Sequence, residues 1–85
     1  MNSFHVWVRP LGETCRVRVD GIRNAEWLLA KLAYGFVFKT AEPIKEDPHS
    51  SCCSFRVAYG SLVSYRGLEK LLAGLGEVVM MTDPA

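Results

Sequence analysis

The segment that most constrains the fold is Asn24–Tyr34, which has the sequence NAEWLLAKLAY. Its apolar residues recur at i, i+3, i+4 and i+7, the spacing that lines one face of an α-helix: Ala25, Leu28, Leu29 and Leu32. Asn24 is expected to be the N-cap, because its side chain can accept a hydrogen bond from a free backbone N–H group. Gly35 is expected to end the helix in a left-handed conformation. The segment therefore predicts an amphipathic helix packed on a hydrophobic core.

Two stretches before this helix alternate between apolar and polar residues, which is typical of strands with one buried face. They are Phe4–Arg9, FHVWVR, and Cys15–Asp20, CRVRVD. Pro10–Glu13 lies between them and contains a proline and a glycine, so it predicts a turn. Because the connection is short, we expect the two strands to form a hairpin.

The residues after the helix predict a strand and then a loop. Phe36–Thr40 is rich in aromatic and β-branched residues, which favour a strand. The alternative is that the helix continues to Phe38, which would remove this strand. Ala41–Ser51 holds two prolines and several charges without periodicity, so we expect a mobile loop.

The second half of the chain repeats the order of the first. Cys53–Tyr59 alternates like a strand, and Ser64 is a candidate N-cap for a helix over Tyr65–Leu75. Glu77–Met81 then predicts the last strand. Both halves run strand, helix, glycine, strand, which is the order of two tandem βαβ units in a ferredoxin-like fold.

These elements predict a single α+β domain over residues 1–85. We expect two helices packed on one face of a four- or five-stranded, mainly antiparallel sheet, with an extra N-terminal strand added to the ferredoxin-like plan. A hairpin between Phe4–Arg9 and Cys15–Asp20 would give the latter strand a neighbour that this plan does not provide. The strand order could therefore differ from the standard one.

Composition and charge limit the classes of protein to which the chain can belong. With 85 residues, 49% of them hydrophobic, and a net charge of +1, it has the composition of an ordinary globular domain without a basic or acidic tail. The first residues lack the features of a signal peptide, and no apolar run approaches the ~20 residues of a membrane span. Three cysteines are too few for a disulfide scaffold. We therefore expect a cytoplasmic protein with reduced thiols and no membrane association.

Short stretches of the chain resemble two known families. Val17–Ile22, VRVDGI, resembles the first-strand motif of RNA-recognition-motif domains, and Cys52–Tyr59 stands where their third-strand motif does. The positions of that family's base-stacking aromatic residues hold polar side chains in this chain: Arg18, Ser54 and Arg56. Asp20–Phe38, followed by the leucine-rich second helix, is similar to ACT-type regulatory domains, and this likeness implies a small-ligand sensor. The usual proline–glycine start of ACT domains is missing, so the chain is assigned to neither family.

The side of the predicted helix opposite its leucine stripe carries two aromatic residues. At ~100° per residue, Trp27 and Tyr34 lie roughly opposite the leucines, with Lys31 beside them. One interpretation is that these aromatics pack beneath the extra strand or the 41–51 loop. The other is that they form a surface for a protein partner or for self-association, because tryptophan and tyrosine are frequent interface anchors.

The predicted sheet also carries a group of arginines. If the apolar sets of the strands face the helices, Arg16, Arg18 and Arg56 project from the opposite face on adjacent strands. Trp7 and Arg9 join them if the first strand lies alongside. Arginines mixed with an aromatic residue are suited to binding phosphate or nucleic acid, while the alternative is a solvated face with acidic counter-ions.

The sequence offers little sign of catalysis or of metal binding. It contains no nucleophile elbow and no glycine-rich phosphate loop, and its carboxylates are scattered. His49, Cys52 and Cys53 do not match a zinc-binding spacing, so we expect no metal and no cofactor. Cys15 and Cys53 are expected in the core and Cys52 at the surface. The sequence therefore predicts a small non-enzymatic interaction or regulatory domain that binds a protein partner or itself, with weak nucleic-acid binding as the alternative.

Overall fold

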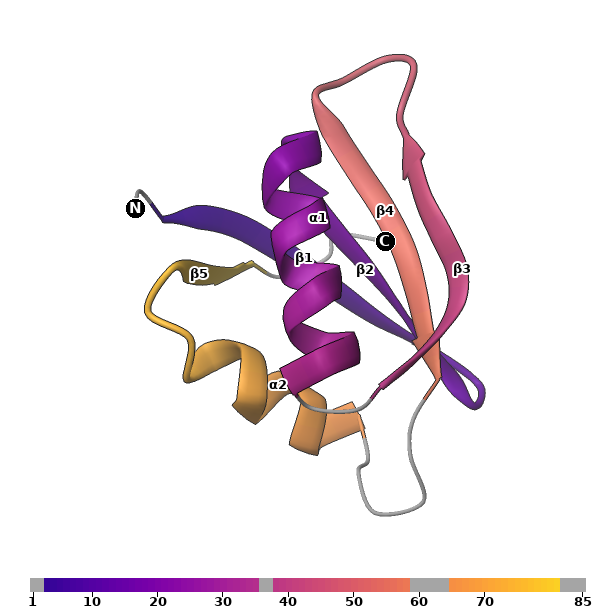
Figure 1. Cartoon of the computed structure of the whole chain (residues 1–85), viewed down its shortest axis with the longest axis vertical. Coiled ribbons are helices and arrows are strands. Elements are labelled where there is room, and N and C mark those ends of the chain that lie inside the picture. The colour runs from indigo at the N-terminus through magenta and orange to yellow at the C-terminus, as the bar shows by residue number, and fades with distance from the viewer. Residues whose placement is uncertain (1–2, 36–37, 59–64, 82–85) are drawn as a thin grey trace.

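The computed structural model describes residues 3–35, 38–58 and 65–81, which form a five-stranded sheet and two α-helices. The strands are β1 (Phe4–Leu11), β2 (Thr14–Asp20), β3 (Lys39–Glu46), β4 (Cys52–Ala58) and β5 (Val78–Met81). The helices are α1 (Ile22–Ala30), the π-helix η1 (Lys31–Gly35) that follows it directly, and α2 (Tyr65–Ala73). In Figure 1, α1 lies in front of the sheet and α2 lies near β5. The predicted α+β class is confirmed.

The hairpin predicted at the start of the chain is confirmed. β1 and β2 are antiparallel, and the turn between them contains Gly12 with a φ of 65°. Glycine suits this position because a side chain is strained at positive φ. The short turn places β1 next to β2 within the sheet.

The strand order is β3-β4-β2-β1-β5, which differs from that of simple βαβ units. The pairs β1–β2, β2–β4 and β3–β4 are antiparallel, and the pair β1–β5 is parallel. β1 therefore separates β2 from β5. This departure follows from the hairpin, because a tight turn forces consecutive strands to be neighbours.

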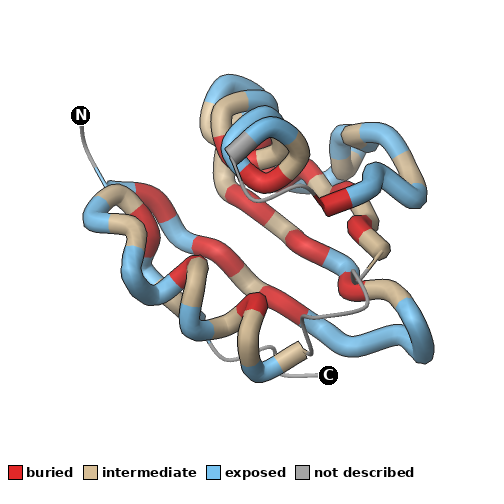
Figure 2. Tube along the Cα trace, turned by 60° about the horizontal axis from the view of Figure 1, so that its bottom comes forward, coloured by how far each residue is buried: buried red, intermediate tan, exposed pale blue. Residues whose placement is uncertain are grey.

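The core is built from the apolar side of the strands and the leucine stripes of the helices. In register, Val6 of β1 lies opposite Val19 of β2, and Val17 of β2 lies opposite Phe55 of β4. Buried positions alternate with more exposed ones along these strands, as Figure 2 shows. The leucines of α1, η1 and α2 join the same cluster: Leu28, Leu32, Leu68 and Leu72. The strand and helix periodicities of the sequence therefore meet in one core.

The prediction of a mobile loop over Ala41–Ser51 is wrong for its first half. Lys39–Glu46 forms β3, which pairs antiparallel with β4 at the edge of the sheet. Ile44 packs against the core, and register shifts on either side of Glu42 fit this irregular strand to its neighbour. Pro43 is compatible with an edge strand, because proline lacks the N–H group that a central strand would use.

The helix predicted over Asn24–Tyr34 is present, but it begins at Ile22 and Asn24 is not its N-cap. Instead, the side-chain amide of Asn24 donates a hydrogen bond to the backbone carbonyl of Asp20 (2.8 Å). Gly21 precedes the helix with a φ of 90°, a conformation that favours glycine. Because Gly21 turns the chain directly from the end of β2, the helix starts earlier than the sequence predicts.

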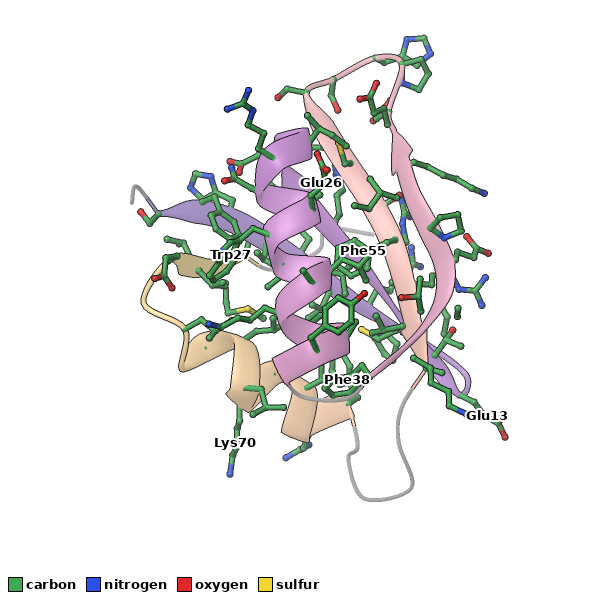
Figure 3. All side chains as sticks on the ribbon, in the orientation of Figure 1. Glu13, Glu26, Trp27, Phe38, Phe55 and Lys70 are labelled. Atoms are coloured by element: carbon green, nitrogen blue, oxygen red, sulfur yellow. The ribbon has the colours of Figure 1, made fainter. Side chains whose placement is uncertain are left out.

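The described helical residues run to Gly35, and the last part is the π-helix η1. Phe38, labelled in Figure 3, is buried and not helical, and its backbone N–H donates to the carbonyl of Leu32 (3.0 Å). The alternative helix that runs to Phe38 is thereby excluded. The strand predicted from Phe36 starts at Lys39 in the structure, while residues 36 and 37 lie outside the described part of the chain.

The second half of the chain keeps the predicted order of elements with slightly different bounds. β4 is Cys52–Ala58, α2 ends at Ala73, and β5 starts at Val78. The predictions for Tyr59 in this strand and for Ser64 as N-cap fall outside the described residues.

Candidate functional site

The face of the sheet opposite the core carries the arginines that the sequence placed there. Because side chains alternate along a strand, the residues between the buried ones on β1, β2 and β4 point to this opposite face. We call five of them the basic sheet face: Trp7, Arg9, Arg16, Arg18 and Arg56. Arg9 and Arg16 are exposed, while the other three side chains are half-buried.

Three of these arginines form a row across neighbouring strands. Arg9 of β1 is the register partner of Arg16 of β2, and Arg16 is the register partner of Arg56 of β4. Directly opposite residues in antiparallel pairs have Cα atoms about 4.5–5.5 Å apart, so the three side chains start from adjacent positions. Like charges opposite each other destabilise a sheet. The row is therefore a concentration of positive charge that sheet formation alone does not favour.

The compensation of this charge is uneven along the row. Arg56 donates hydrogen bonds to the carboxylate of Glu42 (2.6 Å) and, from Nη2, to the hydroxyl of Thr14 (3.0 Å). Arg56 therefore has an acidic counter-ion in Glu42. This agrees with the alternative that the sequence left open, a face whose charges are balanced by carboxylates. Arg9 and Arg16 form no ion pair with any residue that the structure describes.

Trp7 and Arg18 form the centre of the next row. They are register partners on β1 and β2, and Cζ of Arg18 lies 5.1 Å from the centroid of the Trp7 ring, a cation–π contact. Met81 of β5 is the register partner of Trp7 on the other side and is exposed. The ring centroids of His5 and Trp7 are 6.1 Å apart. The indole therefore lies between an apolar edge at β5 and the arginines of β2 and β4.

A contact between a histidine and a carboxylate lies at the margin of the same face. Nδ1 of His5 is 3.0 Å from the carboxylate of Asp20, and the backbone N–H of His5 donates to the same carboxylate (3.3 Å). Both side chains are partly exposed. The Asp20 carboxylate is thus engaged by β1.

The structure adds Lys45 to this surface, a residue that the sequence placed in the predicted loop. Lys45 is the register partner of Ser54, which is in turn the partner of Arg18. Lys45, Arg16 and Arg18 contribute to the lining of an open pocket of about 300 Å³. The sequence signal for this strand was weak, because Ile44 is the residue of β3 that packs against the core and apolar alternation is lacking.

Asp47 gives the same pocket an acidic side and shapes the turn into β4. Its carboxylate accepts hydrogen bonds from the backbone N–H of His49 (2.9 Å) and from the hydroxyl of Ser50 (3.0 Å). These bonds, the one from His49 first, hold the pKa of the Asp47 carboxyl below its usual value. The cationic groups that β2 and β3 bring to the pocket therefore lie near a firmly ionised carboxylate.

Comparisons with protein-family models, with curated proteins and with solved structures found no match for this chain. In the part of the chain that the structure describes, neither helix is long and apolar enough to cross a membrane. Within the same residues, no group of three or more histidine, cysteine, aspartate or glutamate side chains is placed to hold a metal ion.

The helix surface predicted from Trp27, Lys31 and Tyr34 is divided in the structure. Trp27 packs against the core, with its ring edge-on to Phe4 of β1 at a centroid distance of 5.8 Å. Figure 3 shows it on the side of α1 that faces β1. Nζ of Lys31 lies 5.4 Å from the Trp27 ring centroid, whereas Tyr34 is 88% exposed. Of the two interpretations of these aromatics, packing beneath the extra strand therefore applies to Trp27, whose ring reaches Phe4, whereas Tyr34 is left exposed.

The three cysteines are buried, and none of them forms a disulfide with another described residue. Cys15 and Cys53 belong to the core, as predicted, and lie toward opposite ends of the β2–β4 pair. Cys52 is 9% exposed, so the prediction of a surface thiol is wrong. It is covered because β4 begins at this residue and pairs it with Asp20 of β2. Burial raises the pKa of the Cys53 thiol.

The chemistry available on the basic sheet face is that of recognition. Guanidinium groups bind phosphate oxygens through pairs of parallel hydrogen bonds, and an indole offers a flat surface for another ring. Both kinds of group stand on strands whose register is fixed by the core behind them. The face can therefore hold an extended anionic ligand in a defined position.

Proposed function

We propose that this domain binds nucleic acid through the basic sheet face. The observation that carries the proposal is the row of Arg9, Arg16 and Arg56 on three neighbouring strands. Like charges in this arrangement oppose sheet formation, and a chain of phosphates laid over them turns repulsion into attraction. The repulsion within this row destabilises the sheet, and a bound anionic polymer would offset that destabilisation.

The surrounding side chains support the same kind of ligand. Lys45 places a further cationic group on β3, where Nζ lies 3.7 Å from the Glu42 carboxylate, and Trp7 adds an aromatic ring within the face. The net charge of the chain is only +1, so placement on the sheet, and not composition, produces this basic surface. Because these groups recognise phosphates and rings, we propose a binding domain and not an enzyme.

Fluorescence anisotropy with labelled oligonucleotides tests the proposal. At low salt we expect a single-stranded oligonucleotide to bind, with an association constant that falls steeply as salt is raised. Replacing Arg9 and Arg16 together by glutamine should weaken binding about tenfold or more. The salt slope should fall by about 1.4, because each phosphate contact on a single strand contributes ~0.7.

The matched control replaces Arg23 and Arg66 by glutamine. Both are exposed on helices, and the double change alters the net charge by the same amount. We expect this control to bind almost as tightly as the unmodified chain. No binding at low salt, or equal weakening in the two double variants, would show that the proposal is wrong.

A second candidate function is self-association through Tyr34. The observation that favours it is the 88% exposure of this aromatic side chain on the π-helix, because tyrosine is enriched at protein interfaces. Sedimentation velocity of the unmodified chain and of Tyr34→Ser tests it. Association that weakens in the variant supports this candidate, and a monomer at high concentration contradicts it.

We also infer that the sheet is a ferredoxin-like plan into which β1 has been inserted. β2 and β4, the first strands of the two predicted βαβ units, are neighbours and antiparallel, as that plan requires. The shared cluster of leucines from α1, η1 and α2 supports helices on one face. On this plan the helices leave the basic sheet face open to a ligand.

A further inference from the structure

We infer that the basic sheet face takes single-stranded nucleic acid in particular, and that one unpaired base stacks on Trp7 in place of Arg18. The inference rests on the proposed function, because it specifies the ligand of the same surface. It starts from one contact: the indole ring of Trp7 already serves as the stacking surface for the guanidinium group of Arg18, at 5.1 Å.

The position of Trp7 joins a surface for a base to a surface for phosphates. Arg9 follows it on the same face of β1, and Arg16 is the register partner of Arg9 on β2. On the β5 side, the partner of Trp7 is the exposed Met81, an apolar neighbour. A nucleotide whose base lies on Trp7 therefore has apolar surface at the base and arginines within reach of its phosphate.

The relative strengths of two contacts favour exchange on the indole ring. A partly buried cation–π contact such as that of Arg18 with Trp7 changes an equilibrium constant by roughly two- to 30-fold. Stacking of a nucleic-acid base on an aromatic side chain changes an equilibrium constant by roughly five- to 150-fold. A base can therefore displace Arg18, and the released guanidinium group then becomes available to a phosphate.

A duplex cannot use Trp7 in this way. Its bases are paired and stacked inside the helix, so it offers the face its phosphates but no free base. The indole therefore selects a single strand, while the arginines bind the phosphates of any strand.

Two oligonucleotides of equal length test this inference on the unmodified chain. One is oligothymidine, and the other carries the same number of phosphates on an abasic backbone. We expect oligothymidine to bind at least fivefold more tightly than the abasic strand, and more tightly than a duplex of the same length. Trp7→Leu should abolish the preference for oligothymidine over the abasic strand, and retained binding of the abasic strand also shows that the variant is folded.

Intrinsic fluorescence gives an independent measurement of stacking. In Trp27→Phe, which keeps an aromatic ring next to Phe4, the fluorescence comes from Trp7. We expect oligothymidine to quench this signal and the abasic strand to leave it nearly unchanged.

The outcomes separate the inference from the proposed function. Equal affinity for the two strands and for the duplex, without quenching, would contradict stacking on Trp7 while nucleic-acid binding itself stands. No binding of any of the three at low salt would contradict both.

Discussion

Arg16 of β2 and Arg56 of β4 lie directly opposite each other in the sheet, but their charges are balanced differently. Arg56 donates hydrogen bonds to Glu42 and Thr14, whereas Arg16 faces a second arginine, Arg9, on its other side. A shift of one residue in register would move the buried valines of these strands to the surface. The core therefore holds the arginines in line on the opposite face, although their mutual repulsion disfavours that arrangement.

Replacing Arg16 by glutamine should make the fold more stable. Relief of like-charge repulsion with Arg9 and Arg56 should raise the free energy of unfolding by about 0.2–1 kcal/mol at low salt. The gain should shrink as salt screens these exposed charges. Urea unfolding at two salt concentrations measures it, with Arg23→Gln on α1 as the control. A loss of stability at low salt would contradict the repulsion.

Replacing Glu42 by glutamine should have opposite effects on stability and on nucleic-acid binding. It removes the carboxylate that Arg56 contacts at 2.6 Å, so the free energy of unfolding should fall by about 0.5–1 kcal/mol. Because Arg56 then lacks a carboxylate partner and keeps only the Thr14 hydroxyl, affinity for a single-stranded oligonucleotide should rise about two- to fivefold. Glu13→Gln, in the exposed turn between β1 and β2, changes the net charge equally and should leave both quantities nearly unchanged.

Replacing Trp27 by alanine should affect stability much more than replacing Tyr34. The Trp27 ring is partly buried against Phe4 and the core, so its loss should lower the free energy of unfolding by about 1–3 kcal/mol. Tyr34 is 88% exposed, so Tyr34→Ala should change the free energy of unfolding by less than about 0.5 kcal/mol. Urea or thermal unfolding compares the two, and similar effects would contradict the packing of Trp27.

The Cys53 thiol should make stability fall at high pH. Burial raises its pKa above the ordinary value of 9.0, so the unfolded chain loses this proton first as pH rises. The protonated Cys53 thiol therefore makes its full contribution to the free energy of unfolding below about pH 9. This contribution is lost progressively as the pH rises above that value. Comparing the pH dependence of unfolding with that of Cys53→Ala isolates this group. An identical decline in the two proteins would show that the thiol is not responsible.

Strands and helices with strong periodicity could be predicted from the sequence because each carries its pattern locally. The alternation of Phe4–Arg9 and Cys15–Asp20 predicted both the hairpin and the face that holds the arginines. The sequence did not predict β3, because this strand lacks apolar alternation: Ile44 is the residue that it packs against the core. Pro43 is also typical of loops. A strand of this kind is recognisable only beside β4, whose backbone groups it pairs with.

Some features of the candidate site could likewise be predicted from the sequence, and others could not. The sequence predicted that Arg16, Arg18 and Arg56 lie on one face, since this follows from alternation along each strand. It did not reveal Lys45 in that surface or the bond from Arg56 to Glu42, which both depend on β3.

By itself, the sequence determined most of the helical and extended segments, β3 excepted, and which side of most of them is apolar. Those properties come from the order of residues within each segment. The tertiary structure decided the rest: the place of β1 between β2 and β5, the packing of Trp27 on Phe4, and the register that aligns Arg9 with Arg16. These features depend on contacts between segments distant in the chain, and burial of a shared core selects one set of such contacts.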